Sequence, residues 1–282
     1  MNAPRMRVSI ISAGRVGTAI GEKLAAAGHH IYNAVAPSPE SLERAYARLP
    51  HAAIASCGTA ASRAQLLVLA VPDPQLAAVV EEITPHVQPR QIVLHTSGSH
   101  GVEVLAPLAE RGALTIAAHP AMTFSGTDAD VERLDGCGWG VTTGDDLTAT
   151  VAELLITEMN GRAIAIAEQH RALYHAAMAH ASNHAAAIAA QARELVEQCA
   201  VQDDSDTARR LLGPLMQQSI AAALDGGWEA ITGPAARDDA AAVRRHLEVI
   251  GTGPVRDSYV ALARAIAEQS GAQGVLVAST SE

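Results

Sequence analysis

Short runs of apolar, often β-branched residues alternate with longer stretches of helical length over the first half of the chain. Continuous apolar runs of this kind are typical of strands that are buried on both faces of a sheet. Glycine or proline follows these runs closely and marks where they end. The expected strands cover residues 6–12, 31–36, 66–71, 91–96 and 114–118, and the expected helices cover residues 16–27, 41–49, 75–83 and 101–110.

The alternation of strand and helix with short connections predicts a parallel sheet with helices on both faces. Two further strands are expected at residues 140–143 and 163–167, around a helix at 147–159. These elements predict a doubly wound α/β domain over residues 1–168.

The pattern changes after residue 168, where one helical stretch runs over residues 169–200 without proline or glycine. Further helices are expected at residues 204–224, 238–250 and 255–269. We therefore predict an all-α domain over residues 169–282. Its first helix is rich in alanine, and small side chains favour helices and let them approach closely. For this reason we also predict a homodimer that forms through the helical domain.

The turn after the first expected strand reads Ser12-Ala13-Gly14-Arg15-Val16-Gly17. It matches the dinucleotide-binding spacing G-x-G-x-x-G except at the first position, where Ser12 replaces glycine. Gly14 would let the backbone approach a pyrophosphate, and Gly17 would let the following helix pack closely on the strand. Because a helix N-terminus attracts anions, we predict that this turn binds a nicotinamide dinucleotide. The alternative is that the turn keeps the shape of a dinucleotide-binding turn but binds no cofactor.

The end of the second expected strand bears on the choice of cofactor. NAD enzymes usually carry an acid there for the ribose hydroxyls, whereas this chain has Ser38, with Glu40 further on. A serine can donate to a 2′-phosphate, and Arg15 and Arg44 can supply positive charge. We therefore predict NADP(H), bound in part through Ser38. The alternative is that Ser38 only caps the following helix.

Ligands of a doubly wound sheet bind beyond the carboxyl ends of its strands. Turns at residues 71–73, 95–98 and 119–124 should meet there. We expect Val71, Pro72 and Ser97 to lie along the cofactor and His119 to lie toward the second domain. The alternatives are that Pro72 only ends its strand and that His95 and His119 are ordinary hydrogen-bonded histidines.

The long helix begins with polar side chains at helical spacing. Intervals of three, four and seven residues place Arg171, Tyr174, His175, Met178 and Ser182 on one face, with Asn183 at its edge. We predict that His175 and Asn183 flank a substrate and that Tyr174 and Ser182 contact it. The alternative is a polar seam between helices or subunits.

Charge and hydropathy exclude several classes of protein. The formal net charge of −10 argues against a nucleic-acid partner, since phosphate binding needs a basic face. No run approaches the roughly 20 apolar residues that span a bilayer, and the N-terminus lacks a signal-peptide layout. We therefore expect a soluble, cytoplasmic protein. His180 and His184 share a helix face without an acidic third ligand, so we expect no metal site.

Motifs over nearly the whole chain carry a resemblance. They are Gly14-Arg15-Val16-Gly17, Ala70-Val71-Pro72-Asp73, His95-Thr96-Ser97-Gly98, His119-Pro120 with Thr123-Phe124, Tyr174-His175 with Ser182-Asn183, and residues 232–238. The chain resembles bacterial Rossmann-like oxidoreductases with a C-terminal helical domain of formerly unknown function. The wider superfamily includes ketopantoate reductase, pyrroline-5-carboxylate reductase and 6-phosphogluconate dehydrogenase. The resemblance implies a Rossmann-type fold, NADP(H), a dimer through the helical domain and, from some relatives, a link to pantothenate biosynthesis.

Two positions depart from that resemblance. One is Ser12, and the other is the lysine that the dehydrogenase branch places at the start of the long helix, where this chain has Arg171 or His175. Arginine stays protonated and is a poor proton donor. The expected acid is therefore His175 or His119, or a water that they position. We expect Arg237 to pair with a substrate carboxylate, or else with a neighbouring aspartate.

These features predict an NADPH-dependent reductase of a small 2-oxo acid, with ketopantoate as the suggested substrate. His175 or His119 would protonate the developing alkoxide, and Asn183 would orient the substrate oxygen. One alternative is an imine reductase of the pyrroline-5-carboxylate reductase type, which needs the same carboxylate clamp. Another is a dinucleotide-binding sensor without turnover, which Ser12 and the missing lysine would favour.

Overall fold

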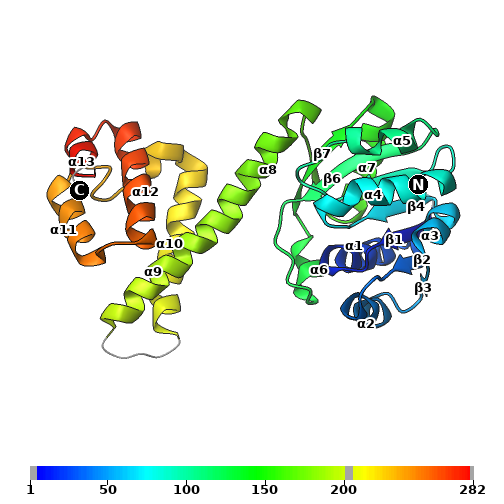
Figure 1. The fold of residues 1–282 in the computed structure, drawn as a ribbon, viewed down its shortest axis with the longest axis horizontal. Coiled ribbons are helices and arrows are strands. Elements are labelled where there is room, and N and C mark those ends of the chain that lie inside the picture. The colour runs from blue at the N-terminus through cyan, green and yellow to red at the C-terminus, as the bar shows by residue number, and fades with distance from the viewer. Residues whose placement is uncertain (1–4, 201–205, 280–282) are drawn as a thin grey trace. The chain divides into compact units, whose positions relative to one another are not determined.

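The structure, a computed structural model, describes residues 5–200 and 206–279. The chain divides into two compact units between Ala179 and His180. The first unit contains a β-sheet and the second is helical (Figure 1).

The sheet of the first unit has eight strands in the order β3-β2-β1-β4-β5-β6-β7-β8. This arrangement confirms the expected Rossmann-type sheet. The short strand β3 was not expected from the sequence. The strands are β1 (Arg7–Ile11), β2 (His30–Val35), β3 (Ala53–Ile54), β4 (Leu66–Leu69), β5 (Ile92–His95), β6 (Leu114–Pro120), β7 (Gly138–Thr143) and β8 (Arg162–Ala165).

The direction of β7 corrects the prediction of a fully parallel sheet. Among the described strands, β6 and β7 pair antiparallel, while the other neighbours pair parallel. After β6 the chain forms an excursion over residues 121–137, in which the short helix α6 packs against α1. Because this excursion contains no crossover helix that returns the chain to the other edge of the sheet, β7 runs opposite to β6.

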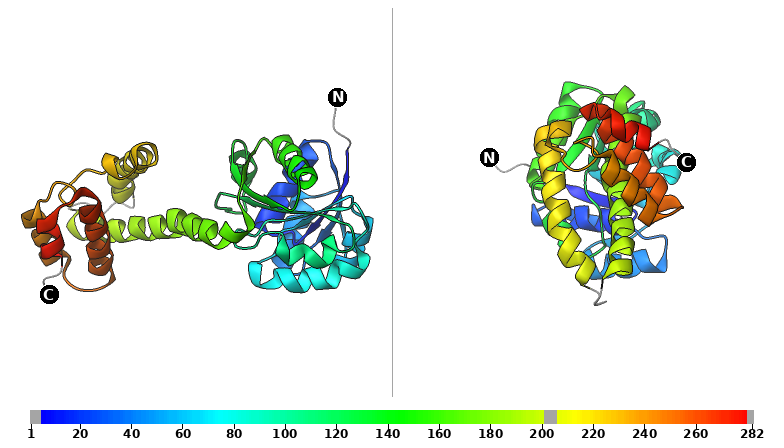
Figure 2. Two further views of the ribbon diagram at one scale, coloured as in Figure 1. Left: turned by 90° about the horizontal axis from the view of Figure 1, so that it is seen from above. Right: turned by 90° about the vertical axis from the view of Figure 1, so that its left-hand side faces the viewer.

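Helices cover both faces of this sheet (Figure 2). The expected helix over residues 101–110 is shorter than predicted, with a 3₁₀ turn and then the four residues of α5. Helix α3 was missed because its residues are mostly small, although Ser56 caps it by accepting from the Thr59 amide. The helices are α1 (Arg15–Ala26), α2 (Pro39–Arg48), α3 (Cys57–Arg63), α4 (Asp73–Ile83), α5 (Ala106–Ala109), α6 (Ala129–Arg133), α7 (Asp146–Glu158) and α8 (Arg171–Ala179), with 3₁₀ turns at Thr84–His86, Glu103–Leu105 and Glu168–His170.

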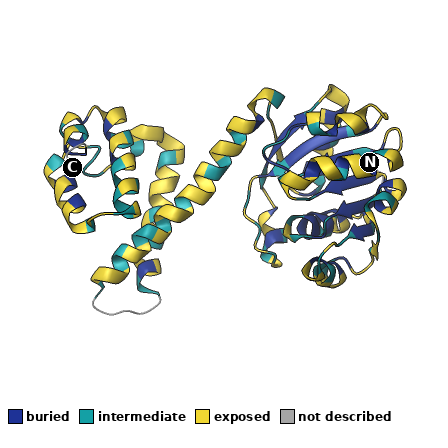
Figure 3. Ribbon diagram, viewed as in Figure 1, coloured by how far each residue is buried: buried dark blue, intermediate teal, exposed yellow. Residues whose placement is uncertain are grey.

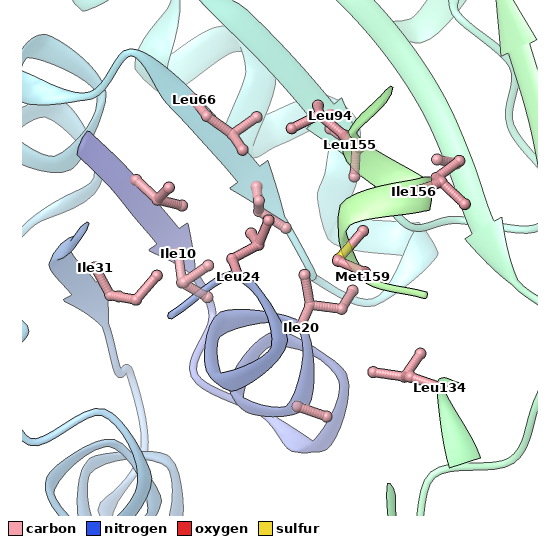
Figure 4. Packing of buried hydrophobic residues seen from close by; sticks show 14 of the residues in the cluster. Ile10, Ile20, Leu24, Ile31, Leu66, Leu94, Leu134, Leu155, Ile156 and Met159 are labelled. Atoms are coloured by element: carbon pink, nitrogen blue, oxygen red, sulfur yellow. The ribbon is translucent and has the colours of Figure 1, made fainter. Parts of the chain in front are cut away.

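Two apolar clusters hold the helices on the sheet, one on each face. Successive residues of a strand point to opposite faces, so Ile10 lies in one cluster and Ile11 in the other. Figure 4 shows Ile10 packed with Ile20 and Leu24 of α1. Each large side chain that is fully buried in this way stabilises the fold by about 1.5–3 kcal/mol.

The second unit is all-α, as predicted, and buries little. Its core comes from α11, α12 and the segment that leads into and forms α13, while the side chains of α9 and α10 are mostly exposed (Figure 3). No helix in the described parts of the chain is long and apolar enough to span a membrane. The expected start of one helix at residue 204 lies outside the described residues. The helices are α9 (Ala185–Cys199), α10 (Thr207–Gly226), α11 (Ala240–Ile250), α12 (Pro254–Ser270) and α13 (Gln273–Ala278), with a 3₁₀ turn at Gly227–Ala230.

The predicted single α-helix over residues 169–200 is interrupted. It begins with a 3₁₀ turn, and residues His180–His184 form a π-helical turn between α8 and α9. A π turn bonds residue i to i+5 and changes the spacing of side chains along a helix. The first residues of the predicted face, from Arg171 to Met178, lie within α8, whereas Ser182 and Asn183 lie in the π turn, where α-helical spacing no longer applies.

Candidate functional site

The turn between β1 and α1 has the backbone of a dinucleotide fingerprint. Ser12 has a φ of +76°, in the left-handed region that glycine adopts without steric cost. A Cβ on Gly17 would lie 2.1 Å from the carbonyl oxygen of Ser12. Helix α1 can therefore approach β1 this closely only with glycine at position 17, whereas Ser12 adopts the required conformation at some strain.

Gly14 lies in a different environment. Its φ is −75°, and the atom nearest to a Cβ there would be Ser12 Oγ at 3.5 Å. Nothing within the described chain therefore requires a glycine at this position. Gly14 is the N-cap of α1, which has no side-chain cap and no acid in its first turn. Open backbone at a helix N-terminus suits an anion, so the turn fits the pyrophosphate of a dinucleotide.

The neighbours of this turn include two arginines. Arg44 donates to the carbonyl oxygen of Ala13 at 3.5 Å, and Arg15 lies against Gly126. Ser38 caps α2 by accepting from the Ser41 amide at 3.2 Å. The expected cap is therefore present, and the contact of Ser38 with a cofactor stays a prediction. The pKa of Glu40 is lowered by its own backbone N–H and by the Ser38 hydroxyl.

A second group of polar residues lies where β4, β5 and β6 end, and the buried His95 organises it. His95 Nδ1 accepts from the Ser97 amide at 3.2 Å, and its Nε2 lies 2.8 Å from the Gly101 carbonyl oxygen. The proton is therefore on Nε2 and is donated to Gly101. Burial lowers the pKa of His95 to about 4. The neutral imidazole thus holds the loop over residues 97–101, as expected of an ordinary hydrogen-bonded histidine.

Polar side chains of that loop bind the first residue of α4. Ser99 donates a short hydrogen bond to Asp73, and His100 Nδ1 lies 2.9 Å from Ser99 Oγ and 3.0 Å from Ser97 Oγ. Burial opposes the ionisation of Asp73, but the hydrogen bonds from Ser99 and Ser97 outweigh it and lower its pKa. Sequence reasoning missed Ser99 and His100, although they directly follow the motif that contains Ser97.

The structure brings together three of the predicted site residues, His119, Tyr174 and His175. His119 Nδ1 lies 2.9 Å from Tyr174 Oη, and their rings meet edge to face at 5.7 Å. A Cβ on Gly98 would lie 2.9 Å from the ring of His175 and 3.2 Å from that of His119. A Cβ on Gly140 would likewise lie 2.5 Å from Tyr174 Oη. Because Gly98 and Gly140 have no side chains, the rings of these three residues can lie directly against the backbone at the carboxyl ends of the strands.

The protonation of this cluster follows from its surroundings. Burial lowers the pKa of His119 to about 4, and the charge of Arg171 acts in the same direction. Burial raises the pKa of Tyr174. Near pH 7 the cluster therefore contains a neutral imidazole hydrogen-bonded to a neutral phenol.

Arg171, the first residue of α8, is buried beside this cluster. Its guanidinium lies 5.7 Å from the centre of the Tyr174 ring. Burial lowers its pKa, although an arginine stays protonated under ordinary conditions. The sequence placed Arg171 on the polar face but gave no sign that it would be enclosed.

Three of the predicted residues, Ser182, Asn183 and Arg237, belong to the second unit. Ser182 and Asn183 are exposed in the π turn, with Ser182 Oγ 3.5 Å from Asn183 Oδ1. Arg237 is exposed, while Asp238 accepts from the Val275 amide and Asp239 caps α11. The substrate contacts assigned to Ser182, Asn183 and Arg237 stay predictions.

The fold and the glycine turn define a Rossmann-like protein, and comparison with family models agrees. Residues 1–120 match the Rossmann-like domain, and residues 137–266 match a domain of unknown function (DUF2520). The order of these two matches agrees with the resemblance that the motifs of the chain indicated. No curated protein matches its sequence.

Solved structures share this fold at low sequence identity. A candidate NADP oxidoreductase from Bacteroides fragilis has a TM-score of 0.76 and 19% identity, over 94% of this chain and 98% of its own. A pyrroline-5-carboxylate reductase from Coxiella burnetii has a TM-score of 0.60 and 16% identity, over 98% and 97%. A Plasmodium falciparum pyrroline carboxylate reductase with NADP bound has a TM-score of 0.58 and 11% identity, over 97% and 95%.

The substitution Ser12→Gly is expected to stabilise the first unit. Relief of the left-handed backbone gains about 1–2 kcal/mol, and the extra entropy of glycine in the unfolded chain offsets about 0.5–1 kcal/mol of it. Urea unfolding measures the difference. The control Ser62→Gly, inside α3, should lose stability, and a similar loss for Ser12→Gly would contradict the left-handed turn.

His95 should make the stability of the protein depend on pH. Its pKa is about 4 in the folded chain, against an ordinary value of 6.5. Between these values the unfolded chain takes up a proton that the folded chain does not, so stability falls as the pH falls from 6.5 to 4. Melting temperatures across this range should fall less steeply for His95→Gln than for the parent. The exposed His51→Gln control should follow the parent, and equal slopes for all three would contradict the assignment.

Proposed function

We propose that the protein is an NADPH-dependent reductase of a small 2-oxo acid. The observation that carries this proposal is that the open N-terminus of α1 and the cluster of His119, Tyr174 and His175 lie at the same edge of one sheet. β5 and β6 lie two and three strands from β1. At about 4.8 Å between strands, this separation is about 10–14 Å, a distance that an extended dinucleotide can bridge.

The turn from Ser12 to Gly17 would hold the pyrophosphate, and Val71, Pro72 and Ser97 would lie along the rest of the cofactor. When bound, the reduced nicotinamide supplies a hydride to a carbonyl. The residues of the chain then have to orient that carbonyl and deliver a proton to its oxygen.

His119 and Tyr174 are suited to orienting that carbonyl and to stabilising the charge that develops on its oxygen. In the tautomer in which Tyr174 Oη–H donates to His119 Nδ1, the Nε2–H of His119 is available to a developing alkoxide. Nε2 lies on the side of Gly98, against which His175 also packs. His175 is exposed and can pass a proton from solvent to the same place. Because His119 is neutral, its Nε2–H stabilises the alkoxide through a hydrogen bond. We therefore assign the delivery of a proton from solvent to His175, with Tyr174 as the residue that positions His119.

The preference for NADPH rests on charge near the turn. Arg44 and Arg15 flank it and could pair with a 2′-phosphate. A candidate NADP oxidoreductase and a pyrroline carboxylate reductase with NADP bound also share the fold. Glu40 opposes this preference, because its carboxylate lies beside the Ser38 hydroxyl.

Paired fluorescence titrations with NADPH and NADH test the proposal. Binding in the micromolar range with NADPH preferred is expected, and Arg44→Ala should reduce the preference. Gly14→Ala should still fold, because no described atom lies closer than 3.5 Å to a Cβ at that position. It should lose only the N-cap preference for glycine, about 1 kcal/mol, yet it should weaken binding at least tenfold. A folded parent that binds neither nucleotide would contradict the proposal.

A second candidate function is the reduction of a cyclic imine. It is favoured by the pyrroline carboxylate reductases among the structures of this fold. NADPH oxidation with ketopantoate or with pyrroline-5-carboxylate separates the two functions. Tight NADPH binding without oxidation by either compound, or by related oxo acids and imines, would favour a sensor.

We also propose that the protein is a homodimer formed through its helical unit. Helix α10 exposes large apolar side chains, among them Leu211 and Leu215, each 60% exposed, and Leu224, 82% exposed. Pairing with a second copy would remove such surface from water.

Light scattering at micromolar concentration should give twice the mass of one chain, and Leu215→Glu should shift the protein toward the single-chain mass. The control substitution Leu147→Glu, at an exposed residue of the first unit, should leave the dimer intact. A single-chain mass for the parent would contradict the dimer.

A further inference from the structure

The guanidinium of Arg171 is buried without a hydrogen-bond partner. Only 2% of the residue is exposed, and its Nε, Nη1 and Nη2 atoms bond to no atom of the described chain. A guanidinium carries five N–H donors and keeps its charge. A buried charge of this kind is strongly unfavourable unless an anion balances it.

The carboxylate of Glu168 does not serve as that anion. Glu168 attracts Arg171 electrostatically, but its Oε2 accepts from the Val102 amide at 2.8 Å. A Cβ on Gly101 would lie 2.1 Å from both Glu168 carboxylate oxygens. The carboxylate is therefore fastened against the backbone of residues 101–102, and within the described chain no carboxylate forms an ion pair with Arg171.

Arg171 instead lines a cavity of about 410 Å³. Ser99 and His100 line the same cavity. The hydroxyl proton of Ser99 is donated to Asp73, but His100 can donate a hydrogen bond to an oxygen ligand through Nε2–H. Glu103 and Glu168 also face it, and their charges would repel a ligand with several negative charges. The cavity therefore suits a small molecule with one carboxylate near Arg171.

The position of Arg171 separates this ligand from the cofactor phosphates. Its charge acts on both His95 and His119, which lie at the carboxyl ends of β5 and β6. These strands lie about 10–14 Å from β1 and its glycine turn. An anion held by Arg171 would lie beside His119 and Tyr174 and not at the pyrophosphate.

We propose that Arg171 binds the carboxylate of the substrate and so places the reacting carbonyl or imine carbon beside His119 and Tyr174. The planar guanidinium matches a carboxylate with two parallel hydrogen bonds. This inference rests on the proposed reductase function and gives its substrate class as small carboxylic acids. It assigns to the buried Arg171 the pairing that the sequence pattern suggested for Arg237.

The test uses malonate as the probe and its neutral analogue malonamide as the control, at constant ionic strength and without nucleotide. Malonate should raise the melting temperature of the parent, and malonamide should not. Arg171→Met should melt at or above the temperature of the parent, because it removes an unbalanced buried charge, and should lose the malonate shift. Arg162→Met, an exposed arginine of the same unit, should keep the shift.

A malonate shift retained in Arg171→Met, or absent in the parent, would overturn the proposal. If Arg171→Met does not fold, NMR of the parent protein tests the proposal. Malonate should then shift the ¹⁵N resonance of Arg171 Nε, and an unchanged resonance would overturn the proposal.

NADPH titration of the same proteins separates this inference from the proposed function. Arg171→Met should bind NADPH within twofold of the parent. Normal NADPH binding without any malonate effect would contradict the carboxylate site but would still support the dinucleotide site. If malonate has an effect that depends on Arg171 but the protein binds no nucleotide, the carboxylate site is supported and the proposed reductase function is contradicted.

Discussion

Parallel pairing of β1, β4, β5 and β6 is the constraint on which the candidate site depends. Parallel strands end at one edge of the sheet, so the turns that follow them meet even though they are far apart in sequence. The glycine turn, the His95 loop and the segment that begins at His119 are brought together in this way. Gly17 maintains the arrangement locally by letting α1 lie directly against β1.

The same edge concentrates polar groups in an environment that does not favour charge. His95 and His119 are kept neutral by burial, and Asp73 stays ionised through hydrogen bonds from two serines. Ser12 adds a strained backbone. Such local costs are typical of binding and catalytic sites, where stability is given up for a preset arrangement of groups. The apolar clusters on the two faces of the sheet offset these costs.

The sequence predicted the elements whose signal is local. The buried strands are continuous apolar runs, and Gly14 and Gly17 stand in a fixed spacing after the first of them. The direction of β7 was not predictable from its own residues, because it depends on the excursion over residues 121–137. The burial of Arg171 depends on what packs around the start of α8. The π turn at His180–His184 was missed because its residues are compatible with an ordinary α-helix.

Gly14 and Gly17 look alike in the sequence, but the fold constrains them differently. The fold itself requires Gly17, since a side chain there would collide with the backbone of Ser12. Within the described chain the fold does not require Gly14. In a protein of this fold without the proposed dinucleotide, position 14 could change freely while position 17 stayed glycine. The residue at position 14 would therefore report on the proposed ligand, and the residue at position 17 on the fold alone.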